Sequence, residues 1–329
     1  MGMSAAVVAL LLAVEPTAGT WAVVHTNPKD TYDAVTVTPG GAVWVAGTRG
    51  KEPLLLKNRK RVAGPGFRVR RLSSASDTRV WAFGTSRYAR WDGKRWQVKP
   101  WPYGRVDRVY PSGSGLWVVE NANTFPAAGQ AGWKATSTLR RLVGSTWRKV
   151  STPIAVKGID GRWGAGSSKG KAALARWSGT AWRTVALPAI PSRHPGQISE
   201  LTDVATDGET GRIMAVGWSA WPCNGAKKPF CGETLLLTGY PGSFEVHSEA
   251  GFQPRAQAEA DGRGGAWIVY PKGGGSAFLH IRPDDVVSGV FPNQKAAVRG
   301  LAHQTESGNL WAVGAAASGG GGTIWAVRP

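Results

Sequence analysis

The tetrapeptide Trp44-Val45-Ala46-Gly47 recurs along the chain, and its spacing decides the fold. The same Trp-apolar-apolar-Gly pattern, intact or varied at one or two positions, begins again at Trp81, Trp117, Trp163, Met214, Trp267 and Trp311. The steps between these seven copies average about 44 residues, the length of one four-stranded blade of a β-propeller. The repeat therefore predicts a seven-bladed propeller. If the repeats at residues 117–163 or 163–214 are assigned wrongly, the number of blades is six or eight.

The residues around each copy predict four short antiparallel strands per repeat. An alternating stretch with a Gly-rich or Asp-rich turn comes before the copy, as at residues 33–41. A second strand follows, as at residues 88–91, and a tight turn such as Asp92-Gly93 leads into a last strand that opens on an aromatic residue, here Trp96. Gly and Asp tolerate the positive φ of hairpin turns. We letter the strands A to D from the axis outward.

The chain ends predict how the ring closes. The last repeat contains strands A, B and C, near residues 298–303, 310–314 and 323–327, but no strand D. The segment at residues 21–28, WAVVHTNP, resembles the strand D at residues 182–188 and has no repeat of its own. We expect it to be the outer strand of the last blade, since a closed ring leaves no long sheet edge unpaired.

Composition excludes several other classes. The 329 residues contain 40 Lys and Arg against 21 Asp and Glu, a net charge of +19, with 45 Gly, 17 Trp and two Cys. The apolar content of 42% is too high for a disordered chain. Abundant Gly and Trp argue against a helix bundle. Two cysteines cannot form a disulfide-stapled mini-fold or an all-Cys zinc site.

The first 19 residues are typical of a signal peptide. Residues 5–14 are ten consecutive apolar residues, too few to span a bilayer but suited to the apolar region of an export signal. The basic start of such a signal is missing, because Lys29 is the first cation. A buried strand is the alternative. We expect a signal peptide at 1–19, one propeller domain at 20–329, and no membrane span.

Cys223 and Cys231 flank a loop of Asn, Gly and Pro. A disulfide could close this loop, and it would contribute about 2–3 kcal/mol in the chain-entropy description. Export favours it, because disulfides persist outside the cytosol. Two free thiols are the alternative.

Two segments resemble the repeats of secreted bacterial propellers of the sensor type, found in two-component regulators. They are GNLWAVG at residues 308–314 and YARWDGKRW at residues 88–96. The resemblance extends over the mature chain at the level of the repeat. It implies a propeller fold and an exported protein, and we expect neither the membrane span nor the kinase domain of those sensors here. The fold itself implies no function.

The strand-B tryptophans are expected to fill the space between blades rather than to bind ligand. In a propeller the D–A and B–C loops share one face around the axis, and this face collects cations and aromatic rings. Such a surface suits an anionic sugar polymer, because cations pair with carboxylate or phosphate and rings stack on sugars. The candidate binding residues are Trp101, Tyr103, Arg105, Trp133, Lys134, Trp218, Trp221, Lys227 and Lys228. Solubilising charge and packed loops are the alternative interpretation.

Catalysis has less support. Asp33, Asp107 and Asp203 each precede a strand-B motif by ten or eleven residues, which places them near the start of strand A. Together with His194 they are the candidate acids and bases of an enzyme, although Asp residues that fix loops have the same pattern. No metal spacing, phosphate loop or hydrolase motif occurs, so we expect no metal and no cofactor.

The leading hypothesis is thus an extracellular, monomeric binding propeller for anionic cell-surface glycans or wall polymers. Nucleic acid is not expected, since no nucleic-acid motif is present. The alternatives are a hydrolase or lyase acting on carbohydrate, and a scaffold for a protein partner.

Overall fold

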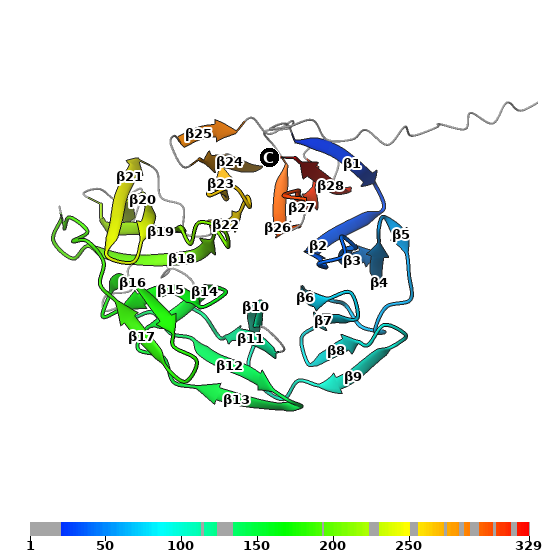
Figure 1. Cartoon of the computed structure of the whole chain (residues 1–329). Coiled ribbons are helices and arrows are strands. Elements are labelled where there is room, and N and C mark those ends of the chain that lie inside the picture. Colours follow the sequence, from blue (N-terminus) through cyan, green and yellow to red (C-terminus); the bar gives the residue numbers. More distant parts are fainter. Residues whose placement is uncertain are drawn as a thin grey trace, which may run out of the picture.

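The computed structural model describes residues 21–112, 115–123, 134–192, 194–223, 230–250, 256–272, 275–282, 286–289, 296–304, 307–316 and 321–328. These residues form seven four-stranded antiparallel sheets, and the sheets surround a common axis as the blades of a propeller (Figure 1). The predicted fold class and blade number are confirmed. None of the described residues belongs to a helix that could cross a membrane.

Each blade runs from an inner strand A to an outer strand D. Blade 1 contains β2 (Asp30–Val37), β3 (Val43–Arg49), β4 (Glu52–Lys57) and β5 (Lys60–Arg61). Blade 2 contains β6 (Arg71–Ser76), β7 (Arg79–Phe83), β8 (Arg87–Trp91) and β9 (Trp96–Pro100). Blade 3 contains β10 (Val106–Ser112), β11 (Gly115–Glu120), β12 (Thr138–Val143) and β13 (Thr146–Val150). Blade 4 contains β14 (Ala155–Asp160), β15 (Trp163–Ser168), β16 (Lys171–Trp177) and β17 (Trp182–Val185).

The remaining blades follow the same order. Blade 5 contains β18 (Ile198–Thr206), β19 (Ile213–Pro222), β20 (Phe230–Tyr240) and β21 (Ser243–Ala250). Blade 6 contains β22 (Gln257–Ala260), β23 (Ala266–Lys272), β24 (Gly275–Ile281) and β25 (Val286–Gly289). Blade 7 contains β26 (Ala297–His303), β27 (Leu310–Ala315), β28 (Gly322–Val327) and, as its outer strand, β1 (Ala22–Asn27).

The two ends of the chain close the ring together, as the sequence predicts. Strand β1 pairs antiparallel with β28, from Ala22 opposite Ala326 to Asn27 opposite Gly322. In Figure 1 the first strand, in blue, lies beside the last, in red. Residues 1–20, where the signal peptide is predicted, lie outside the described residues.

Aromatic rings hold neighbouring blades together. The strand-B Trp of one blade packs against the strand-D aromatic of the next. Trp117 lies 5.5 Å from Trp182, and Trp44 lies 5.8 Å from Trp96, in edge-on geometry. Such pairs stabilise beyond the burial of their area. The predicted role of the tryptophans between blades is confirmed for these residues, whose strand-B rings are buried.

The strand-B Trp of blade 7 is an exception to this packing. Trp311 is only half-buried, although the repeat predicts a filled position. The reason lies in blade 1, whose outer strand β5 is two residues long and contains no aromatic residue. The ring of Trp311 therefore has no strand-D partner to cover it.

The glycine that ends the Trp-apolar-apolar-Gly motif is present for a steric reason. Opposite Gly47, Gly166, Gly217 and Gly314, strand A contains one extra residue, a β-bulge. At the bulge the backbone of strand A approaches strand B so closely that a Cβ on Gly217 would overlap the carbonyl oxygen of Glu200, and one on Gly314 that of Ala297. The glycine therefore admits the bulge, and the bulge redirects one side chain in each inner strand.

The cysteines form the predicted disulfide. Cys223 and Cys231 are joined across the B–C loop of blade 5, with their Cα atoms 5.1 Å apart. The bond connects the end of β19 to the start of β20, opposite Trp221. It fixes the base of a loop whose residues 224–229 lie outside the described ranges.

Candidate functional site

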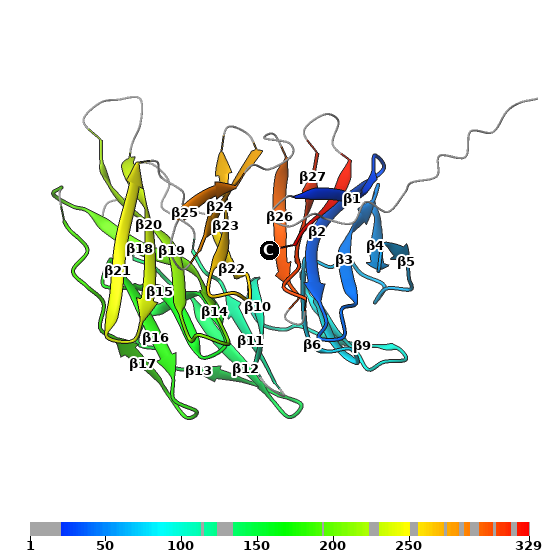
Figure 2. The ribbon, with the colours of Figure 1, turned by 45° about the horizontal axis from the view of Figure 1, so that its top comes forward.

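A cavity of about 880 Å³ lies on the propeller axis, lined by the inner strands of all seven blades. Every inner strand runs from the D–A loops to the A–B hairpins, so the cavity has two distinct ends. We call the end where the inner strands begin the mouth, and the other the far end. Figure 2 shows the blades tilted, with inner strands such as β22 and β26 beside the axis.

Charge differs between the two ends. The mouth half is lined by four cations and four carboxylates, Arg71, Arg108, Lys157, Arg299, Asp33, Asp107, Glu200 and Asp203. Three further arginines, Arg68, Arg70 and Arg105, are exposed beside it. The described lining of the far half has four carboxylates and no Lys or Arg, namely Asp160, Asp207, Glu209 and Glu259. An anion would therefore be favoured at the mouth and repelled toward the far end.

The bulges supply much of the mouth. The extra residue of strand A is Asp33 in blade 1, Asp107 in blade 3, Lys157 in blade 4, Thr202 in blade 5 and Arg299 in blade 7. Arg70 takes the equivalent place in blade 2. Its backbone N–H donates to the carbonyl of Phe83, the residue that pairs with Arg71 across the sheet. All of these residues line the axial cavity or the hollow beside it. The bulge position thus contributes a side chain to the mouth or its neighbouring hollow in blades 1, 3, 4, 5 and 7, and Arg70 does so in blade 2.

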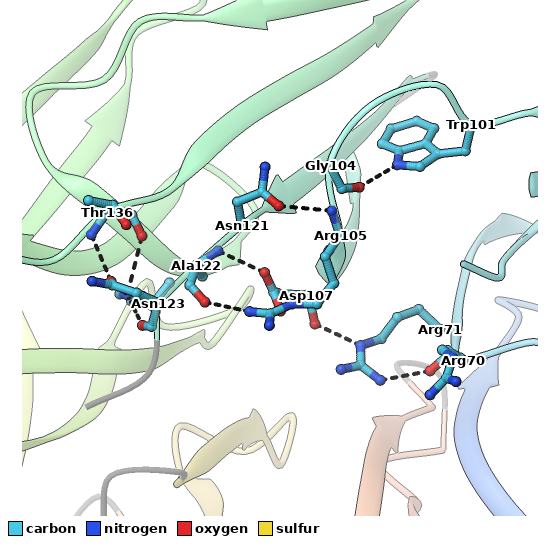
Figure 3. A network of polar contacts seen from close by, with 11 residues as sticks. Arg70, Arg71, Trp101, Gly104, Arg105, Asp107, Asn121, Ala122, Asn123 and Thr136 are labelled. Carbon is cyan, nitrogen blue, oxygen red and sulfur yellow. Dashed lines mark hydrogen bonds and ion pairs between the residues drawn. The ribbon is translucent and has the colours of Figure 1, made fainter. Parts of the chain in front are cut away.

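Asp107 fixes a loop at the mouth, as Figure 3 shows. Its carboxylate accepts the N–H of Ala122 at 2.7 Å and an N–H of Arg105 at 2.8 Å. Arg105 also donates to the Ala122 carbonyl, and Arg71 donates to the backbone carbonyl of Asp107. These contacts are those of a residue that fixes a loop, which is the alternative role that the sequence predicts for this Asp.

Asp203 lies deeper and contacts a different set of groups. The hydroxyl of Tyr110 donates to it at 3.3 Å, the Ala258 N–H donates at 3.3 Å, and the Arg108 guanidinium lies 3.9 Å away. Burial raises the pKa of Asp203, and Arg108 opposes that rise. The same burial raises the pKa of Tyr110, so the phenol stays a donor at neutral pH.

Lys157 ties a long loop to the mouth. Its ammonium donates to the Asn123 side-chain oxygen at 2.9 Å and lies 3.5 Å from the Glu200 carboxylate. Burial lowers the pKa of Lys157 and raises that of Glu200 to about 7, while each group's opposite charge counters the shift of the other. The contact joins the B–C loop of blade 3 to blades 4 and 5.

Glu259 is the most perturbed carboxyl of the far half. Its pKa is raised to about 8, chiefly by burial and then by the charges of Asp160 and Asp203. One of its oxygens accepts the His303 N–H at 3.2 Å. A carboxyl in this state is largely protonated at neutral pH, so it can donate a proton or a hydrogen bond inside the cavity.

A Glu259→Gln variant should show what this carboxyl does to stability. The folded state holds the Glu259 proton more tightly than the unfolded chain, so wild-type stability falls as pH rises from about 4.5 to 8. The amide keeps the acceptor for His303 but carries no charge. We expect the variant to be more stable than wild type by more than about 1 kcal/mol at pH 8.5, and to differ little at pH 4. Urea unfolding at both pH values measures this.

The control for that experiment is Glu52→Gln, on the exposed start of β4. It should follow the wild-type pH dependence. A Glu259→Gln curve parallel to wild type from pH 4 to 8.5 would contradict the assignment.

The predicted binding aromatics divide into buried and exposed rings. Trp101 is 3% exposed and Trp218 is 1% exposed, so neither ring offers a face to a ligand. Trp101 packs among Phe83, Tyr88 and Trp147, and its indole N–H donates to the Gly104 carbonyl. We therefore leave these two out of the binding surface.

Tyr103 and Trp221 are more accessible but already have partners. Tyr103 is 37% exposed, and the Arg140 guanidinium lies 3.7 Å from the centre of its ring. Trp221 is half-buried beside the disulfide and stacks on the His194 imidazole at 4.2 Å. Arg105 and Lys134 are exposed. Trp133, Lys227 and Lys228 lie outside the described residues.

The candidate catalytic residues are not brought into one unit. Asp33, Asp107 and Asp203 come from blades 1, 3 and 5, and each is held by its own partners. His194 lies in the loop before β18 and stacks on Trp221. No hydrogen bond or ion pair joins any two of the four. Among the described residues, no group of three His, Cys, Asp or Glu is arranged to hold a metal ion.

Several residues that define the cavity charge were not predicted from the sequence, namely Arg70, Arg71, Arg108, Arg299 and Glu259. The available signal was their position, because each lies within a few residues of the expected start of strand A. The bulge hides it, since one extra residue breaks the alternation that would assign these side chains to a face.

Comparison with known proteins gives the fold alone. No protein-family profile matches the chain, and no curated protein matches its sequence. Among solved structures, hydrazine synthase of Kuenenia stuttgartiensis is similar with a TM-score of 0.59 and 12% identity, over 92% of this chain and 96% of that one.

Two further structures share the architecture. The extracellular domain of a proposed one component system from B. thetaiotaomicron has a TM-score of 0.55 and 11% identity, over 93% of this chain and 39% of that one. The GH74 xyloglucanase of Xanthomonas campestris has a TM-score of 0.54 and 11% identity, over 94% and 53%. At such identities the shared propeller says nothing of a shared ligand or reaction.

Proposed function

We propose that this protein is an exported binding propeller that holds an anionic cell-surface glycan or wall polymer at the mouth of its axial cavity. The observation that carries the proposal is the separation of charge along the axis. Four cations and four carboxylates line the mouth half and three further arginines are exposed beside it, whereas the described cavity lining of the far half contains four carboxylates and no Lys or Arg. A polyanion would therefore engage the mouth face and stop there.

Two observations support the rest of the proposal. The Cys223–Cys231 disulfide fits an oxidising compartment. An extracellular domain and a xyloglucanase are among the proteins that share the propeller architecture. The charge at the mouth is the basis for the anionic ligand class.

The direct test is retention on an immobilised anionic polysaccharide, polygalacturonate, with neutral dextran as the matched matrix. At about 50 mM salt, where screening is weak, we expect retention on polygalacturonate only. Retention should be lost by about 0.5 M salt, since the contacts are ionic and partly exposed. Absence of salt-sensitive retention at 50 mM would remove the proposal.

A second candidate function is hydrolysis or elimination on a carbohydrate. The specific observation in its favour is Glu259, a carboxyl with a pKa of about 8 beside Asp160 and Asp203. A carboxyl that keeps its proton at neutral pH, with further carboxyls nearby, is the arrangement that a general acid requires. New reducing ends or unsaturated products, formed from polygalacturonate during the retention experiment, would support this candidate instead.

A further inference from the structure

A second hollow of about 390 Å³ lies beside the mouth, between the inner strands of blades 6, 7, 1 and 2. Its charged lining consists of Arg70, Arg71, Arg299 and Asp33. Asp33 and Arg299 are the bulge residues of the neighbouring blades 1 and 7, and Arg70 takes the equivalent place in blade 2. The bulges therefore bring to one place side chains that are far apart in the sequence. We call this hollow the arginine pocket.

The carboxylate in the pocket is fully engaged by arginines. One oxygen of Asp33 accepts Arg299 at 2.8 Å, and the other accepts Arg68 at 2.8 Å. A single negative charge is thus shared by two guanidinium groups. Arg299 still has donors that Asp33 does not use, because a guanidinium presents five N–H groups.

Among the described residues, no carboxylate forms an ion pair with the other two arginines. Arg71 donates to two backbone carbonyls, those of Asp107 and Arg70 (Figure 3). The guanidinium of Arg70 makes no hydrogen bond or ion pair with the described residues. Burial, together with the nearby charge of Arg108, lowers the pKa of Arg71, and the charge of Asp107 opposes this shift. The pocket therefore holds more positive charge than the protein itself neutralises.

We propose that the arginine pocket is a subsite for one oxyanion group, a carboxylate, sulfate or phosphate, carried by the polymer that binds at the mouth. This inference rests on the proposed function and specifies where it acts. Arg70, Arg71 and Arg299 offer planar forks of N–H donors, the geometry that suits a trigonal or tetrahedral oxyanion. Asp33 holds Arg299 in place and partly competes with the ligand for it.

The experiment compares three single substitutions, Arg70→Gln, Arg299→Gln and Arg90→Gln. Arg90 lies on β8 of blade 2 and is exposed, so Arg90→Gln makes the same change of charge away from the pocket. Calorimetric titration with inorganic sulfate and phosphate measures the site alone. Retention on polygalacturonate, dextran sulfate and polyglycerol phosphate identifies which oxyanion it prefers. We expect binding to weaken about tenfold or more in the first two variants and less than twofold in Arg90→Gln.

Asp33→Asn provides a readout of opposite sign. Neutralising the competing carboxylate should strengthen anion binding several-fold, although it removes two ion pairs. A residue that merely supported the fold would weaken binding when changed. Weaker binding by a folded Asp33→Asn variant, judged by an unchanged circular dichroism spectrum, would overturn the assignment of Asp33 as a competitor and with it the proposed geometry.

The outcomes separate this inference from the proposed function. If wild type is retained on the polymers and Arg70→Gln behaves like Arg90→Gln, the subsite is wrong and the proposed function stands. If no polymer retains wild type while inorganic anions bind in a manner that depends on Arg70 and Arg299, the subsite stands and the polymer is wrong. Wild type that binds neither polymer nor inorganic anion refutes both.

Discussion

Replacing Trp21 by alanine is expected to lower the free energy of unfolding by about 3–5 kcal/mol, a large fraction of the stability of a single domain. The side chain is 2% exposed. Its ring lies 5.6 Å from Trp267, edge-on, and 4.9 Å from Phe278. Trp21 is thus the strand-D aromatic of blade 7, packed on the strand-B Trp of blade 6. Its loss loosens the one blade that joins both ends of the chain. Urea unfolding followed by tryptophan fluorescence measures the effect.

Val23→Ala is the matched control for Trp21→Ala. Val23 lies on β1, two residues after Trp21 and opposite Trp325, but is 46% exposed. We expect a change below about 0.5 kcal/mol. Equal effects of the two substitutions would mean that β1 contributes through its backbone pairing alone, and the packing argument would fail.

The second large effect is expected from Gly217→Ala. The added methyl would overlap the carbonyl oxygen of Glu200, where strand A bulges toward strand B. Backbone on both sides must shift, because no flexible side chain is available to yield. We expect the free energy of unfolding to fall by about 3 kcal/mol or more, with disturbance of the mouth around Glu200 and Thr202. Chemical denaturation gives the first quantity and anion binding the second.

Gly208→Ala is the control for the glycine. Gly208 lies in the A–B turn of the same blade, and a Cβ there would meet no atom within 4 Å. Its φ is not in the left-handed region, so alanine is unstrained. This variant should match wild type. A neutral Gly217→Ala would show that the motif glycine is not required by the bulge.

The repeat made the fold predictable from sequence. Large rings such as Trp44 and Trp117 recur because they fill most of the interfaces between blades, and the glycine three residues later recurs because the bulges of blades 1, 4, 5 and 7 leave no space for a Cβ there. Closure was predictable for the same reason, since residues 21–28 resemble an outer strand and the last repeat lacks one. These features depend on local contacts that are the same in each blade.

The site was less predictable because it is made from differences between blades. Arg70 and Arg299 are 229 residues apart and meet only through ring closure. Two aromatic residues of the loops were wrongly predicted to bind ligand because their burial could not be recognised in the sequence. Trp101 and Trp218 look available in the sequence, but a large ring at the edge of a blade gains more from burial against its neighbour than from solvent.

Ring closure also has a consequence for biosynthesis. Among the strands of the propeller β1 is synthesised first and its partner β28 last. Until β28 has been synthesised, the six other blades can form from neighbouring hairpins, while β1 has an unpaired edge that could pair with other chains. A nascent chain held unfolded until its synthesis is complete, as in post-translational translocation, avoids that hazard.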